Sequence, residues 1–262
     1  MAALWRTLAL VLALLLLGLT WPASAHPEDE FCTPGEDGMD PALCLALREL
    51  DRPGEVSAPA VKKAPIIERS AWSTFTTYVA IGTRHILPGG LDHILFVLAF
   101  FLSSVRLRAL LWQIGAFTVA HTATLGLVAG GVLTPPAAIV EPFIALSIVW
   151  VAVENLLRDD ASRYRLALVF AFGLVHGMGF AGFFGELGLP SGQFFSALVG
   201  FNVGVEIGQL TVIAVALLLT FWLRPRAAGD GRDLVYRRWV VRPVSAAIAL
   251  VALVWFFQRI LG

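Results

Sequence analysis

Six side chains with metal-binding groups lie in apolar stretches of this chain: His85, Asp92, His93, His121, His176 and Glu206. Imidazole nitrogens and carboxylate oxygens are the ligands that borderline divalent ions prefer. Ionisable groups are costly inside a bilayer, so those that occur there usually mark the path of an ion or substrate. We therefore predict that these six residues bind a metal ion within a membrane.

Four polar side chains are spaced so that they share a helical face with these ligands: Thr118, Thr124, Asn202 and Gln209. The two threonines lie three residues on either side of His121, and the two amides lie four residues before and three after Glu206. We expect these groups to hydrogen-bond to the ligands and orient them. On the other face of the same helix, Gly200, Gly204 and Gly208 predict close packing against a neighbouring helix.

The composition is that of an integral membrane protein. The chain has 262 residues, of which 58% are hydrophobic and 15% are charged, and its mean hydropathy is +0.78. Apolar runs close to the ~20 residues needed for a span occupy residues 72–104, 109–133, 137–157, 166–187, 194–223 and 244–261. We expect an all-α bundle of about six transmembrane helices, with the lipid bilayer and a metal ion as partners and no nucleic acid.

The first of these runs is broken by Pro88, Gly89 and Gly90. Proline removes a backbone donor, and irregular backbone at membrane depth is tolerated mainly where it lines a cavity. Two arrangements are compatible with this break. Residues 72–87 form a half-helix or interfacial helix and the true span starts near Leu91, or residues 72–104 form one long tilted span.

The two ends of the chain are expected outside the cytoplasm. Residues 1–25 combine Arg6, an apolar run and small residues at 23–25, which predicts a cleaved signal peptide; an uncleaved first helix is the alternative. Arginines then fall in alternate loops, at 106–108, 158–165 and 224–242, which the positive-inside rule makes cytoplasmic. The predicted location is a bacterial inner membrane, with both mature ends in the periplasm.

The exported segment, residues 26–71, is acidic and contains both cysteines of the chain, Cys32 and Cys44. An oxidising compartment favours a disulfide between them. A second hypothesis makes this segment a metal-capturing arm, because His26 would present an amine and an imidazole together beside the acidic residues Glu28, Asp29 and Glu30. The third interpretation is a solvated acidic linker. The membrane domain then comprises residues 72–262.

Four sequence motifs surround the candidate ligands: HILPGGLDHILF at 85–96, FTVAHT at 117–122, FGLVHG at 172–177 and NVGVE at 202–206. These motifs resemble those of the HupE/UreJ family of membrane proteins, which is associated with nickel uptake for hydrogenase and urease. The resemblance covers roughly residues 72–261. It implies that His85, Asp92 and His93 are essential for metal transport. The family motif has five residues between its histidine and its Asp-His pair, whereas this chain has six, the extra one falling at the Pro-Gly-Gly break.

The ligand set and the resemblance favour a permease for a divalent metal ion, nickel first, with cobalt, zinc or copper as alternatives, rather than an enzyme. No G-x-x-x-x-G-K-[ST] loop is present, which argues against an ATP motor in this chain. Because imidazole must be neutral to bind metal, uptake should decline below about pH 6.5. An intramembrane zinc hydrolase and a bis-histidine haem protein are the competing hypotheses, and the oligomeric state stays open.

Overall fold

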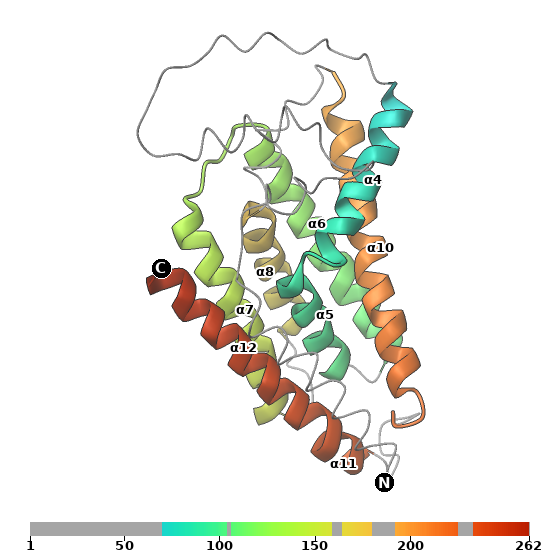
Figure 1. Cartoon of the computed structure of the whole chain (residues 1–262), viewed down its shortest axis with the longest axis vertical. Helices are drawn as coiled ribbons and strands as arrows, with labels where there is room; N and C mark the ends of the chain where they lie inside the picture. Colours follow the sequence, from blue (N-terminus) through green and yellow to red (C-terminus); the bar gives the residue numbers. More distant parts are fainter. Residues whose placement is uncertain (1–69, 104–105, 159–163, 180–191, 225–232, 262) are drawn as a thin grey trace.

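The computed structural model describes residues 70–103, 106–158, 164–179, 192–224 and 233–261 (Figure 1). Every element within these ranges is helical, which confirms the predicted all-α class. The elements are α4 (Ala71–Ile86), α5 (Leu91–Ser103), α6 (Leu107–Ala129), α7 (Ala137–Leu157), α8 (Arg165–Gly179), α10 (Phe194–Thr220), α11 (Asp233–Tyr236), the π-helix η1 (Arg237–Val241) and α12 (Arg242–Leu261). The predicted signal peptide, the arm up to residue 69 and its Cys32 and Cys44 lie outside the described residues.

The predicted number of spans is approximately right. Among the described residues, four helical segments are long and apolar enough to cross a membrane, namely α6, α7, α10 and the continuous stretch Asp233–Leu261. The pair α4 and α5 makes a fifth if it is counted as one bent span. Helix α8 is apolar but shorter. It covers the start of the span expected at 166–187, whose remaining residues lie outside the described ones. Apart from α11 and η1, and with α4 and α5 taken together, each described helix coincides with a predicted apolar run to within two residues at its start.

The predicted break in the first span is confirmed. Helices α4 and α5 meet at an angle of 71°, because Leu87 is extended, with φ −128° and ψ 113°, the conformation that a following proline favours. Gly90 completes the turn, since a Cβ atom there would overlap the backbone carbonyl of His85. With 16 and 13 residues, the helices are only about 24 and 20 Å long, so neither crosses a ~30 Å hydrocarbon core alone.

Helix α4 packs along α10, as Figure 1 shows, and glycines permit the close approach. A Cβ atom at Gly200, Gly204 or Gly208 would overlap α4, in the last case at the Ile86 side chain. Gly82 faces the other way and meets the backbone of Phe201 in the same manner. The predicted glycine strip is therefore a helix-packing surface, and it fixes the end of α4 against the middle of α10.

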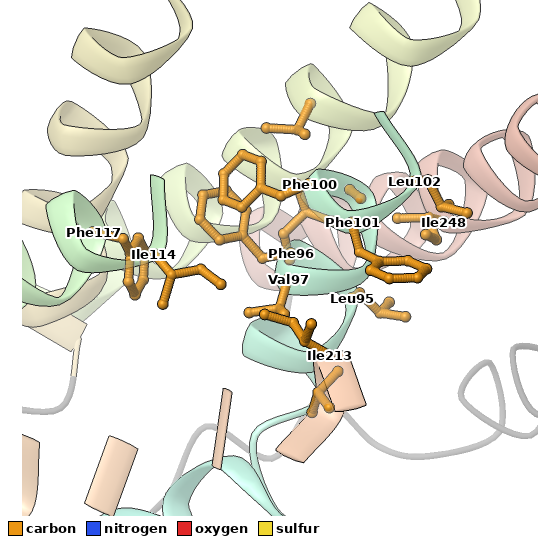
Figure 2. Close-up of a cluster of buried hydrophobic side chains, with 14 of the residues drawn as sticks. Leu95, Phe96, Val97, Phe100, Phe101, Leu102, Ile114, Phe117, Ile213 and Ile248 are labelled. Atoms are coloured by element: carbon orange, nitrogen blue, oxygen red, sulfur yellow. The ribbon is translucent and has the colours of Figure 1, made fainter. Parts of the chain in front are cut away.

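Helix α5 forms the centre of the bundle, in contact with α7, α10, α12 and α6. Its phenylalanines Phe96, Phe100 and Phe101 are almost fully buried and join residues of the surrounding helices in the hydrophobic cluster of Figure 2. The outward faces of the bundle are apolar as well, and large side chains there, such as Trp112, Phe143 and Leu218, are mostly exposed. Such extensive apolar exposure fits a surface covered by lipid.

Basic residues gather at one end of the bundle. Arg237 donates a hydrogen bond to the carbonyl of Arg158, which joins the end of α7 to the start of the last helical segment. The guanidinium of Arg224 lies 4.2 Å from the ring centroid of Phe101, near the end of α5. These contacts bring the predicted cytoplasmic connections to the same end.

Candidate metal site

The helices converge so that four histidines meet within the bundle. His85 lies in the last turn of α4 and His93 in the first turn of α5, and the bend between these helices turns the two imidazoles toward each other, with ring centroids 4.8 Å apart. His121 comes from the interior of α6 and His176 from the last turn of α8. The sequence therefore folds with the Pro-Gly-Gly break as the corner of the site.

Three of these residues, His85, His93 and His121, form what we call the three-histidine group. Each offers one ligand nitrogen, and these nitrogens lie within 4.8 Å of one another. The side chains are 9%, 5% and 0% exposed, so the group is enclosed by protein. Three imidazoles around one point match the three-ligand arrangement that leaves room for exchangeable ligands on a metal ion.

The unpaired ring nitrogens of His93 and His121 are also consistent with a ligand-binding role. Both ring nitrogens of each residue are buried without a hydrogen-bond partner among the described residues. Leaving a buried polar atom unsatisfied costs about 1–3 kcal/mol, and most such atoms in native proteins are paired. A metal ion would bind the lone pair of one nitrogen in each ring and so remove part of this cost.

His93 is the central imidazole. Besides His85, its ring lies 5.9 Å from that of His121 and 5.1 Å from that of His176, centroid to centroid. His176 Nε2 is 2.9 Å from Ser147 Oγ of α7, so one of its nitrogens is already engaged. His176 is thus an oriented fourth imidazole that adjoins the three-histidine group without belonging to it.

Phenylalanine rings enclose the histidines. Phe96 and Phe117 lie 4.8 and 5.2 Å from the ring of His176, centroid to centroid, and Phe201 lies 5.5 Å from that of His85. All three phenylalanines are at most 1% exposed. These rings hold the imidazoles in fixed orientations and keep water from most sides. The dry environment strengthens the interaction between a cation and its ligands.

Two glycines of α8 determine how closely its histidine approaches α6. A Cβ atom at Gly173 would lie 2.6 Å from the carbonyl oxygen of Phe117, and one at Gly177 would overlap both the carbonyl of His121 and the hydroxyl of Thr124. The absence of side chains at these positions lets the two helices pack backbone to backbone. Gly177 therefore belongs to the architecture of the site although it carries no ligand.

Asp92 has an ion-pair partner that the sequence had not indicated. Successive helical residues point about 100° apart, so Asp92 turns away from the ring of its neighbour His93. Its Oδ2 atom lies 2.8 Å from Nη2 of Arg259, near the end of α12. The predicted role of Asp92 as a metal ligand stays a prediction, and the structure gives this carboxylate an ion pair beside the three-histidine group.

Glu206, on α10, is not a member of the three-histidine group, and it contacts Thr118, which the sequence had placed beside His121. Thr118 Oγ1 is 2.6 Å from Glu206 Oε2 and 3.2 Å from Gln209 Oε1. These three side chains form an oxygen-rich cluster between α6 and α10. The expected shared face of Glu206 and Gln209 is thus present, and Glu206 as a metal ligand stays a prediction.

The other two predicted orienting residues bond mainly to their own helices. Thr124 Oγ1 donates to the carbonyls of Ala120 and His121, and Asn202 Nδ2 donates to that of Leu198. Both side chains are buried. Sequence reasoning missed Ser147 and Arg259. For Arg259 a signal existed, since an arginine near the end predicted to be periplasmic runs against the positive-inside bias; a lone serine within a span offers no such signal.

The comparisons with known proteins concern most of the described chain. A family model described as HupE / UreJ protein matches residues 61–259. No curated protein matches the chain, and no solved structure does. The matched range includes all of the histidines at the site and ends at Arg259.

Proposed function

The chain belongs to the HupE/UreJ family, and we propose that it carries a divalent transition-metal ion across a membrane through the three-histidine group. This family is associated with nickel and cobalt transport. The observation that carries the proposal is the convergence of three buried imidazoles, with ligand atoms within 4.8 Å, inside a bundle of membrane-length apolar helices. We propose nickel as the first substrate and cobalt as the second.

The donor set suits such a substrate. Imidazole nitrogen binds nickel, cobalt, zinc and copper, so the family association, rather than the ligands, favours the first two. A transport site must bind strongly enough to replace water around the ion and weakly enough to release it. Three neutral imidazoles without a carboxylate in the group meet this requirement better than a fully charged ligand set.

We propose a path with three stations. The ion enters beside Asp92, binds the three-histidine group with His93 at its centre, and passes toward His176 and the oxygen cluster of Thr118, Glu206 and Gln209. This order is supported by the adjacency of Asp92 and His93, by the 5.1 Å between the rings of His93 and His176, and by the position of α6, which contributes to both later stations.

The basic residues at one end of the bundle indicate how the protein is oriented in the membrane. We propose that this end, which includes Arg158 and Arg237, faces the cytoplasm of a bacterium and that the protein lies in the cytoplasmic membrane, because basic connections are retained on that side. In that orientation the ion moves inward, from the corner between α4 and α5 toward the basic end. Both mature termini would then be periplasmic.

Transport by the purified protein in proteoliposomes tests the proposal. We expect wild type to take up ⁶³Ni²⁺ or Co²⁺, and His121→Ala to reduce the initial rate by at least the roughly 10- to 100-fold that even the loss of an outer-shell partner produces at metal sites. Val119→Ala is the matched control, because this α6 side chain is 64% exposed and lies away from the site.

Two outcomes would decide against the proposal. If wild-type vesicles take up neither ion above the level of protein-free vesicles, the transport function is wrong. If wild type transports and His121→Ala transports equally well, the function stands and the assignment of the three-histidine group is wrong.

A further inference from the structure

Arg259 holds Asp92 at the edge of the three-histidine group. The distance from Arg259 Nη2 to Asp92 Oδ2 is 2.8 Å, and the two side chains are 8% and 24% exposed. Arg259 also donates from Nη1 to the carbonyl of Glu141, at 3.2 Å, and its guanidinium carbon lies 5.9 Å from the ring centroid of Trp255. One guanidinium therefore links α5, α7 and α12 beside the proposed site.

A positively charged guanidinium beside the three-histidine group is unfavourable for the binding of a metal cation. Asp92 immediately precedes the central imidazole, His93, in α5, and Arg259 is paired with that carboxylate. A fixed guanidinium repels an arriving divalent ion, and its ion pair occupies the carboxylate that would attract that ion. Burial of an arginine is costly, so a site built only for tight binding would not place one here.

We propose that Arg259 is a built-in counter-ion that the transported metal ion displaces from Asp92. In the empty protein the guanidinium neutralises the carboxylate and holds it at the edge of the site. When a divalent ion binds the three-histidine group, Asp92 turns its charge to the ion and the guanidinium is released. When the ion leaves, Arg259 recovers Asp92, which favours release. Arg259 is thus a positioning residue, and this inference rests on the proposed transport function.

The counter-ion should lower the affinity for the metal ion and raise the rate of transport. Competition from a tethered cation weakens metal binding, as any ligand that prefers the metal-free state must, while it speeds the exit of the ion. Removal of Arg259 should therefore tighten binding and slow transport together. A purely structural ion pair predicts the reverse for binding, because its loss would loosen the corner where α5, α7 and α12 meet.

The test compares metal binding by purified wild type and Arg259→Gln, measured by equilibrium dialysis with Ni²⁺ and Co²⁺. We expect the variant to bind on the order of tenfold more tightly, which corresponds to about 1.4 kcal/mol. In proteoliposomes it should show a lower KM and a lower maximal rate. Arg242→Gln is the matched control, since it removes an exposed arginine from the first turn of the same helix and should leave affinity unchanged.

A double variant tests whether the expected increase in metal affinity depends on Asp92. In an Asp92→Asn background, Arg259→Gln should no longer tighten binding, because the carboxylate that it would free is absent. If Arg259→Gln does not fold, Arg259→Lys gives the second readout. Lysine binds a carboxylate as a point charge and without the guanidinium fork, so affinity should rise about two- to threefold, an amount smaller than a tenfold change.

The outcomes separate this inference from the transport function. If wild type neither binds nor transports the two ions, the proposed function fails. If wild type binds and transports, but Arg259→Gln or Arg259→Lys leaves affinity unchanged or weakens it, the counter-ion role is overturned. Tightening that persists in the Asp92→Asn background would overturn that role as well.

Discussion

Two buried polar side chains of this bundle, Asn155 and His93, differ in how their polar atoms are satisfied. Near the basic end, Asn155 Nδ2 donates to the carbonyl of Ala99 at 2.8 Å and lies 3.3 Å from Ser245 Oγ, and its Oδ1 accepts from Arg165 at 3.2 Å. In the three-histidine group, neither ring nitrogen of His93 has a hydrogen-bond partner among the described residues. The amide of Asn155 is satisfied within the protein, whereas the nitrogens of His93 are available to a ligand.

The difference separates polar groups that stabilise the fold from polar groups that bind the substrate. Asn155 joins α7 to α5, α8 and α12 through specific hydrogen bonds, and it sits beside the pair of Arg165 and Glu154, whose charged atoms are 3.9 Å apart. Unsatisfied imidazoles contribute no such bonds. Substitutions of His93 and Asn155 should therefore divide into one that affects transport and one that affects stability, and the first two predictions below test that division. The last two concern residues that pack or orient the site and should affect both.

The largest expected effect is the loss of transport in His93→Ala. His93 is the central imidazole, so we expect uptake to fall by more than the roughly 10- to 100-fold seen when only outer-shell partners of a metal are lost. Thermal stability should change little, because the removal of two unsatisfied buried nitrogens offsets part of the cost of the cavity that the ring leaves. Initial uptake rates and thermal unfolding of the same preparation measure both. Retained transport with lowered stability would reverse the division.

Asn155→Ala should act in the opposite direction. It leaves the carbonyl of Ala99 and the Arg165 guanidinium without their partner, and we expect a loss of about 1–3 kcal/mol in the free energy of unfolding. The affinity of the folded fraction for Ni²⁺ should stay within about twofold of wild type, far below a tenfold change. Leu157→Ala serves as control, because this nearby side chain is 79% exposed. Weaker metal binding by folded Asn155→Ala would show that the two residues are coupled.

Gly177→Ala should combine a moderate effect on stability with one on the site. Its added methyl group would overlap the carbonyl of His121, and forcing an atom into a packed interface costs typically about 1–3 kcal/mol. Because α8 must move away, His176 should shift too and uptake should fall. Gly115→Ala on α6 is the control, since nothing lies within 4 Å of its added Cβ and helix propensity favours alanine. Equal behaviour of the two variants would contradict the close packing of α6 and α8.

Ser147→Ala should give the smallest effect. It removes the hydroxyl that engages His176 Nε2. We expect uptake to fall by roughly 10-fold, the lower end of the range for the loss of an orienting partner at a metal site, and stability to change by about 1 kcal/mol. Ser147→Thr keeps the hydroxyl and should retain most of the uptake rate. If alanine and threonine behave alike, His176 does not depend on this hydrogen bond.

The sequence predicted the elements better than their meeting points. Periodicity and hydropathy located every described membrane-length helix, and the residue types at 88–90 predicted the bend between α4 and α5. Pairing of side chains from distant helices depends on helix rotation and tilt, which local patterns do not encode. For this reason the sequence identified Asp92 and Glu206 as special without indicating that the first faces Arg259 and the second faces Thr118.

The histidines illustrate the same limit. Four imidazoles at similar depth predicted a shared site, and the structure brings all four together. Which three form the closest group depends on the 71° bend and on the contact of Gly177 with α6, and neither is encoded in the spacing of the histidines. Ser147, which orients His176, resembles any other serine in a span until the two helices are packed.

X-ray absorption at the nickel or cobalt edge of the metal-loaded protein tests the central claim most directly, because it counts the imidazoles bound to the ion. We expect wild type to show three imidazole ligands, and His85→Ala, His93→Ala and His121→Ala each to lose one of them or to lose the ion. A wild-type spectrum without imidazole ligands, or one unchanged in all three variants, would contradict the assignment of the three-histidine group as the metal site.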